Sequence, residues 1–219
     1  MIPLLLSLKV AGLATIIATI AGVSFAWLAA KREFWGKEFL DAVLTLPVVL
    51  PPTVLGYYLL VLLGRRGPIG SWLESQFGIN LIFTWQGAVI AASIVAFPLV
   101  YKSARSAFEA VSRQLEDASR VLGKSEIQVF SLVTLPLALR GILAGAMLAF
   151  ARALGEFGAT LMVAGSLPGK TQTLSIAVYE AVQAGHDQIA NFLVIVTSIV
   201  CIVVLLASNY LFRPKYRVT

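Results

Sequence analysis

Five long apolar windows constrain the fold of this chain more than any other feature. A helix needs about 20 apolar residues to cross the hydrocarbon core of a bilayer, and it satisfies its backbone hydrogen bonds internally, as lipid requires. Only 13% of the 219 residues are charged, against about 25% in a soluble domain. The sequence therefore predicts an all-α, polytopic membrane protein with five transmembrane helices in one domain over residues 1–219. The windows are residues 8–30, 43–63, 88–103, 137–163 and 189–212. The third is the shortest and is expected to begin near Trp85.

Lys and Arg residues favour one set of loops. Twelve of the 17 lie in or beside the loops that follow the first, third and fifth windows. Cytoplasmic loops carry the excess of basic residues, so we expect the N-terminus outside, the C-terminus inside and the loop over residues 109–136 in the cytoplasm. Arg65 and Arg66 run against this pattern but are outnumbered. The twelve are Lys31, Arg32, Lys37, Lys102, Arg105, Arg113, Arg120, Lys124, Arg140, Arg213, Lys215 and Arg217.

Small residues recur at every fourth position in two windows. Such faces let helix backbones approach closely in lipid, so they predict packing faces on the first and fourth helices. The first face consists of Ala14, Ala18, Gly22, Ala26 and Ala30, and the second of Gly141, Gly145, Ala149 and Ala153.

Catalytic and metal-binding signatures are not expected in this chain. The single histidine, His186, and the single cysteine, Cys201, have no neighbours at nucleophile or metal-ligand spacing. Residues 165–171 look like a phosphate-binding loop but are one residue short of it and lie on the outer side. The net charge of +6 is explained by the loop bias, so nucleic acid is not an expected partner. Any energy source must be another subunit.

Residues 109–136 form the one long hydrophilic stretch. Apolar and small residues between 115 and 122 recur at helical spacing, and Gly123 is placed to end that helix in the left-handed conformation. Ser125 and Gln128 have the capping-box spacing that starts a second helix. The charges are mixed in sign, which favours a protein partner over a lipid surface. The stretch is predicted to be a helix–glycine–helix docking surface.

Two windows contain residues that are costly inside a membrane. Pro47, Pro51 and Pro52 remove backbone donors and predict a kinked or unwound segment, which is tolerated at membrane depth beside protein or a watery cavity; a plain structural kink is the alternative. Arg152 and Glu156 lie one turn apart, and each costs about 2.5–3.5 kcal/mol at a helix centre. They are either a self-neutralising pair that locks a helix interface, or Arg152 helps set the potential that an anion meets in transit.

Six loop residues match the spacing of a known motif. They are Asp117, Ala118, Ser119, Gly123, Leu135 and Pro136. Together they resemble the EAA loop of ABC-importer permeases, with Asp for the usual Glu and Ser for the second Ala. In that family the loop is the coupling helix that seats in a cleft of the cytoplasmic ATPase. The resemblance implies that these residues, with the adjacent Glu116, couple this chain to a separate ATPase.

Two further blocks narrow the resemblance. Residues 151–160 resemble the fourth-span signature of oxyanion permeases, and Thr160 after Gly-Ala is most like the molybdate members; residues 46–57 fit the same group. Over residues 8–212 the chain is thus similar to molybdate ABC transporter permeases of bacterial or archaeal inner membranes. The residues implied in the translocation pathway or dimer interface are Pro47, Pro51, Pro52, Arg152, Gly155, Glu156, Gly158 and Thr160.

The resemblance also implies an assembly. A permease of this kind has the type I importer fold and forms a homodimer. Two ATPase subunits use ATP and Mg, an extracytoplasmic binding protein delivers molybdate, and transport proceeds by alternating access. This chain itself would bind no cofactor or metal and would have no catalytic residue.

Two alternatives stay open. A permease for sulfate, thiosulfate or tungstate would carry the same loop, because these oxyanions are similar in charge and shape. A channel or secondary transporter that needs no ATPase would show internal repeats and a charge relay, and neither is visible beyond Arg152 and Glu156.

Overall fold

The structure, a computed structural model, describes residues 2–31 and 35–211 and is built from helices throughout these ranges. Four basic residues that contribute to the predicted charge bias, Arg32, Arg213, Lys215 and Arg217, lie outside the described residues. Within the described ranges, four helices are long and apolar enough to cross a membrane, or five when one bent pair is counted as a span. The prediction of an all-α membrane protein is confirmed.

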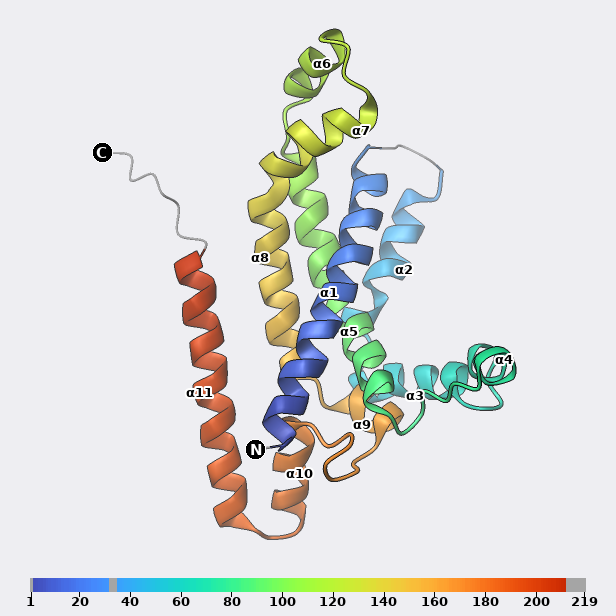
Figure 1. Cartoon of the computed structure of the whole chain (residues 1–219), viewed down its shortest axis with the longest axis vertical. Coiled ribbons are helices and arrows are strands. Elements are labelled where there is room, and N and C mark those ends of the chain that lie inside the picture. Colours follow the sequence, from blue (N-terminus) through green and yellow to red (C-terminus); the bar gives the residue numbers. More distant parts are fainter. Residues whose placement is uncertain (1, 32–34, 212–219) are drawn as a thin grey trace.

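Four long helices run along the main axis of the molecule (Figure 1). They are α1 (Ile2–Lys31), α5 (Trp85–Glu109), α8 (Leu135–Leu154) and α11 (Asp187–Leu211). The third predicted window does begin at Trp85. Helices α6 (Arg113–Val121) and α7 (Glu126–Val129) form what we call the loop end, and α10 (Leu174–Gln183) lies at the opposite, far end.

Helix α5 is the centre of the bundle, and both small-residue faces pack on it. On one side, a Cβ added at Gly22 of α1 would lie 2.9 Å from the Cβ of Val100. On the other, a Cβ at Gly141 or Gly145 of α8 would lie 2.6 Å from the side chain of Ala107 or Ser103. Only glycine allows these backbones to come so close, which confirms the predicted packing faces.

The second window is two helices and not one straight span. Helix α2 (Lys37–Val49) and α3 (Pro52–Leu63) meet at an angle of 110°, so α3 runs across the bundle axis (Figure 1). Leu50 and Pro51 both have extended backbone angles, because a residue before proline is disfavoured in the helical region. Pro47 lies inside α2 without breaking it. The predicted break is confirmed, and two of the three prolines make it.

The fourth window is also interrupted, and here the expectation of one helix was wrong. Helix α8 ends at Leu154, and α9 (Gly158–Ala164) begins after a three-residue break. Glu156 stabilises the break, because its Oε1 accepts a hydrogen bond from the backbone N–H of Ala159, 2.8 Å away, at the start of α9.

The helix that follows the loop end enters the bundle through a π-helical segment, Phe130–Thr134, so that Glu126–Leu154 is continuous. Pro136 has no N–H and its ring would clash with the carbonyl four residues earlier in a regular helix. The wider turn relieves this conflict: the N–H of Leu135 donates to the carbonyl of Phe130, five residues back.

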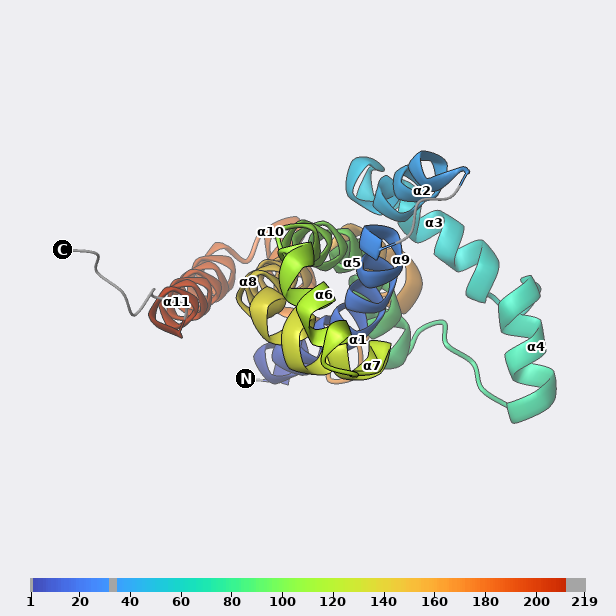
Figure 2. The ribbon, with the colours of Figure 1, turned by 90° about the horizontal axis from the view of Figure 1, so that it is seen from above.

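Seen from the loop end, two parts stand away from the bundle (Figure 2). Helix α11 lies apart on one side. On the other, α3 and α4 (Pro68–Phe77) project sideways; we call residues 52–77 the arm. Near the N-terminal end of α2, Asp41 accepts hydrogen bonds from Tyr101 (2.8 Å) and Arg105 (2.6 Å) of α5, which hold the two helices together.

Candidate functional site

The loop end has the helix–glycine–helix geometry that the sequence predicts. Gly123 has φ +78°, in the left-handed region, and its N–H donates to the carbonyl of Arg120 at 2.9 Å, which closes α6. Ser125 then caps α7 reciprocally with Gln128: its Oγ accepts from the backbone N–H of Gln128, and its own N–H donates to Oε1 of that side chain. The two helices are therefore set at a fixed turn.

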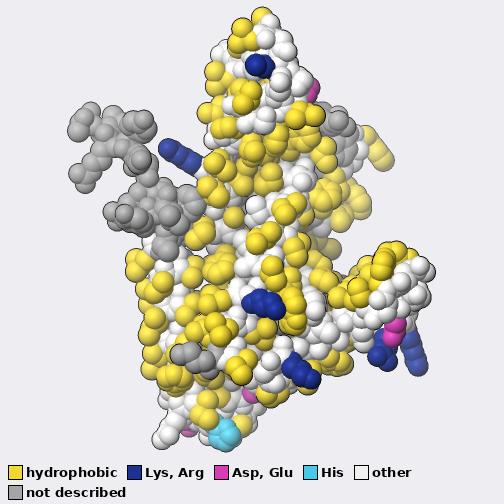
Figure 3. Space-filling model, viewed as in Figure 1, with side chains coloured by type: hydrophobic (Ala, Val, Ile, Leu, Met, Phe, Trp, Pro, Cys, Tyr) yellow, Lys and Arg dark blue, Asp and Glu magenta, His cyan; other side chains and the backbone are white. Residues whose placement is uncertain are grey.

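The tip of the loop end presents apolar side chains that the chain leaves uncovered. Val121 and Leu122 are 87% and 79% exposed, and Ile127 is 81% exposed. Figure 3 shows hydrophobic side chains reaching the tip of the molecule. Exposed apolar groups outside a membrane, rimmed by charged side chains, are typical of a protein-interaction surface.

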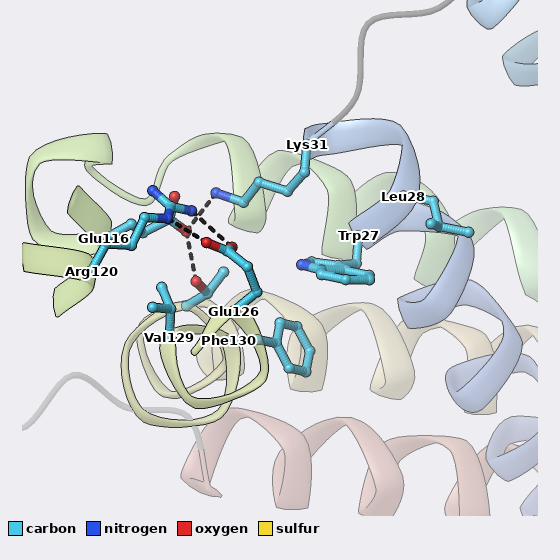
Figure 4. A pocket seen from close by; sticks show the side chains of 9 residues that line it. Trp27, Leu28, Lys31, Glu116, Arg120, Glu126, Val129 and Phe130 are labelled. Carbon is cyan, nitrogen blue, oxygen red and sulfur yellow. Dashed lines mark hydrogen bonds and ion pairs between the residues drawn. The ribbon is translucent and has the colours of Figure 1, made fainter. Parts of the chain in front are cut away.

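Glu116 points inward and holds the loop to the rest of the chain. Its side chain is 4% exposed, and its Oε1 accepts hydrogen bonds from Lys31 Nζ at 2.5 Å and Thr134 Oγ1 at 2.6 Å. These contacts join α6 to the end of α1 and to the π-helical segment (Figure 4). Although burial alone would raise it, the bonds from Lys31 and Thr134 hold the pKa of Glu116 below its ordinary value.

A second set of ion pairs fixes α6 to α7. Arg120 lies 2.6 Å from Asp117 and 2.6 Å from Glu126, on either side of the glycine turn. Next to it lies a cavity of about 290 Å³ whose lining includes Trp27 and Phe130, and the ring centroids of these two residues are 5.2 Å apart (Figure 4). The loop end is thus a preformed unit attached to α1 and α8.

The sequence grouped Glu116 with its exposed neighbours, and the structure separates them. Asp117 and Ala118 are exposed, whereas Glu116 is buried. Its partner Lys31 is 85 residues away in the chain, and no local pattern pointed to it. Leu135 and Pro136 lie further back, in the helix that leads into the bundle.

The two helix breaks lie next to each other. A Cβ added to Gly158 would lie 2.9 Å from the Cβ of Pro52, and one added to Gly56 would lie 2.7 Å from Met162. Helices α3 and α9, the pieces beyond each break, therefore pack directly on each other. Pro47 lies elsewhere, beside a cavity of about 210 Å³ among α1, α2 and α5. Thr160 is buried within α9.

Arg152 and Glu156 form an ion pair at this junction. Arg152 Nη1 lies 2.7 Å from Glu156 Oε2; the Glu156 side chain is 1% exposed and that of Arg152 is 33% exposed. The buried carboxylate thus has two roles, since it also accepts from Ala159 at the start of α9. Gly155, between them, is exposed at the end of α8.

Among the residues that the structure describes, no group of three or more His, Cys, Asp or Glu side chains could hold a metal ion.

Long apolar helices, two adjoining helix breaks and a polar helical loop at one end are the architecture of a polytopic membrane protein. Residues 18–218 match the family model described as "binding-protein-dependent transport system inner membrane component", and the chain belongs to this family. It is a permease subunit of an ABC importer, in which the ATPase is a separate subunit.

The chain is similar to permeases of several ABC importers, and its identity to a molybdenum permease is higher than its identity to a sulfate permease. The chain is 48% identical over 210 residues to the molybdenum transport system permease protein ModB of Escherichia coli (strain K12), covering 95% of this chain and 92% of that one. It is 34% identical over 214 residues to the probable sulfate transport system permease protein cysT of Chlorella vulgaris, covering 98% and 80%. Its fold is similar to a chain of the inward-facing MetNI methionine ABC transporter, with a TM-score of 0.74, 16% identity, and coverage of 98% and 95%.

Proposed function

We propose that this chain moves molybdate across the cytoplasmic membrane, as the permease of an ATP-driven importer that works by alternating access. The observation that carries the substrate is the 48% identity to a molybdenum permease over 95% of the chain, against 34% for a sulfate permease. The pathway-lining segments are within the matched region. Tungstate and sulfate remain the competing substrates.

The loop end is the docking site for the ATPase. Its apolar tip is uncovered, its turn is fixed by Gly123 and the capping box, and Glu116 ties it to α1. A rigid loop transmits displacement, whereas a flexible one would absorb it. ATP and Mg are used by the partner, and two ATPase subunits serve two copies of this chain. Closure of the ATPases would then draw the two loop ends together and switch the pathway between two states.

A second copy of this chain completes the pathway. Five helices hardly enclose a route for a hydrated dianion, and apolar side chains such as Val48 and Val49 on α2 and Tyr57 on α3 are left exposed beside the helix breaks. Pro51 and Pro52 lie on this uncovered side, next to Gly158. We place the route between two such surfaces, with the loop ends in the cytoplasm. A binding protein delivers the anion at the far end.

Arg152 faces this route, and its positive charge is partly neutralised by Glu156. Its guanidinium is partly exposed while its partner Glu156 is buried, so the carboxylate orients the arginine and weakens its field without covering it. This arrangement combines the two interpretations that the sequence left open. A transport route must attract its anion without holding it tightly.

Substrate choice is tested with the cognate soluble binding protein. Calorimetry against molybdate, tungstate and sulfate, followed by competition of the same anions in uptake through the assembled importer, should rank molybdate at or above tungstate and well above sulfate. Binding of sulfate in preference to molybdate would assign the chain to a sulfate importer.

A further inference from the structure

Within the arm, α4 is the helix whose role the transport mechanism does not explain. In α4 only Gly70 is buried. The arm projects sideways from the bundle in both views (Figures 1 and 2). It also carries Arg65 and Arg66, the two arginines that run against the charge bias of the loops.

Helix α4 is amphipathic. Ile69, Trp72 and Phe77 are 45%, 55% and 63% exposed and lie on one side of the helix, where the rings of Trp72 and Phe77 contact each other with centroids 5.6 Å apart. Ser71 and Glu74 lie on the opposite side at helical spacing. A helix this uncovered, with aromatic residues on its apolar side, needs a partner for that side.

The apolar and polar sides of α4 face in opposite directions along the axis of the spans. In Figure 3 hydrophobic side chains follow the edge of the arm that faces the loop end, and basic and acidic side chains follow the opposite edge. The only charged residues between 52 and 84 are Arg65, Arg66 and Glu74. A bilayer changes polarity along this same direction. A second copy packed in the membrane plane would instead meet the arm along its length, across both edges.

A recess with mainly apolar lining and two arginines lies where α3 meets α4. A cavity of about 540 Å³ is lined by Arg65, Arg66 and Asn80 together with Leu60, Ile82 and Phe83. Arg65 has only a loose ion pair with Glu74, at 3.5 Å, and both its side chain and that of Arg66 are exposed. Two arginines beside apolar side chains suit a phosphate that carries acyl chains.

We propose that α4 lies flat in the membrane interface at the far end, with Ile69, Trp72 and Phe77 among the acyl chains and with Arg65 and Arg66 bound to the phosphate of an anionic phospholipid. Interfacial helices and aromatic belts have this arrangement. The proposal explains why two arginines occur on the side of the membrane that is otherwise poor in them. It does not depend on which anion is transported.

The depth of α4 is tested with spin labels. The assembled importer carries Cys201→Ser in this chain, with either Ile69→Cys or Ser71→Cys labelled, in vesicles of phosphatidylcholine and phosphatidylglycerol. The label at 69 should be relaxed mainly by lipid-soluble oxygen and the label at 71 mainly by a water-soluble nickel complex. If nickel reaches both labels equally, or neither oxygen nor nickel reaches position 69 because protein covers it, the interfacial location is wrong.

The headgroup contact is tested by thermal stability. Phosphatidylglycerol should raise the melting temperature of the importer above that in pure phosphatidylcholine, and Arg65→Gln with Arg66→Gln should abolish this difference. Lys170→Gln, a neutralised exposed lysine in another far-end loop, should keep it. An undiminished difference in the double variant would overturn the site. So would stabilisation by free inorganic phosphate in phosphatidylcholine alone, since that would indicate a site for soluble oxyanions.

Discussion

Glu116 and Asp117 are neighbouring carboxylates with opposite environments. Asp117 is exposed and pairs with Arg120 within the loop. Glu116 is buried and bonds to Lys31 and Thr134, which belong to other parts of the chain. Hydrogen bonds to charged groups contribute about 1.5–3 kcal/mol each, and exposed ion pairs contribute much less. The buried carboxylate is thus the one that fixes the loop end in place.

Glu116→Gln should lower the stability of the loop end and remove one component of its pH dependence. The pKa of Glu116 in the folded chain is below its unfolded value of about 4.5, so its contribution is present above that value and is lost as the pH falls through the folded pKa. The melting temperature of the wild type should therefore fall as the pH is lowered below about 4.5. The variant should start lower at neutral pH and show a smaller fall.

Asp117→Asn is the matched control for this experiment, because it makes the same chemical change one residue away. It should leave the melting temperature nearly unchanged. Equal losses in the two variants would mean that Glu116 has no special structural role.

Arg152 is the second residue whose environment yields a prediction. Arg152→Ala should abolish uptake while the protein still inserts and assembles, because a partly exposed positive charge at the helix breaks is removed. Arg152→Lys should retain part of the activity, since it keeps the charge but not the planar guanidinium. Normal uptake by the alanine variant would remove Arg152 from the transport mechanism.

At the scale of elements, the molecule combines one rigid connection with two breaks. The loop end continues without interruption from Glu126 through the π-helical segment to Leu154. Helices α3 and α9, by contrast, are detached from α2 and α8 and pack on each other. Movement at the loop end would therefore reach the bundle through α8 and α1.

Two changes in the loop should uncouple the ATPase without altering substrate choice. Gly123→Pro is incompatible with φ +78°, because proline fixes φ near −65°. Asp117→Lys reverses the charge beside Arg120. Each variant should assemble poorly with the ATPase, or should leave its hydrolysis unresponsive to loaded binding protein.

Gly185→Pro supplies the control for the turn. Gly185 also has a left-handed φ, +68°, and open space around it, but it lies between α10 and α11. Hydrolysis in this variant should still respond to loaded binding protein. Full coupling in both loop variants would show that the loop end does not dock the ATPase.

At the scale of the whole molecule, local patterns predicted the local structure well. Apolar windows predicted the spans, and Gly123 with the capping box predicted the helix–glycine–helix turn of the loop end. The paired prolines predicted the break before α3. The break at residues 155–157 was missed because apolar composition continues across it, and only the glycines and Glu156 marked it. Contacts between distant segments, such as Lys31 with Glu116, were beyond any periodicity argument.

The positions of α3 and α4, which leave two surfaces uncovered, were likewise beyond prediction from local patterns. Sequence patterns identified apolar windows, but not that α3 lies across the bundle or that α4 projects from it (Figure 1). Those arrangements depend on the packing of Gly56 and Gly158 against partners about a hundred residues away in the chain. The proposed contacts with a second copy and with lipid both rest on these arrangements.

We propose that this chain transports molybdate only as part of an ATP-driven assembly. The direct measurement is uptake of radiolabelled molybdate into vesicles that contain this chain, with and without its ATPase and binding protein. Uptake should require ATP on the side of the loop end and binding protein on the far side, and should be absent when the ATPase is omitted. Molybdate uptake by this chain alone would contradict the requirement for an ATPase and would identify a channel or secondary transporter.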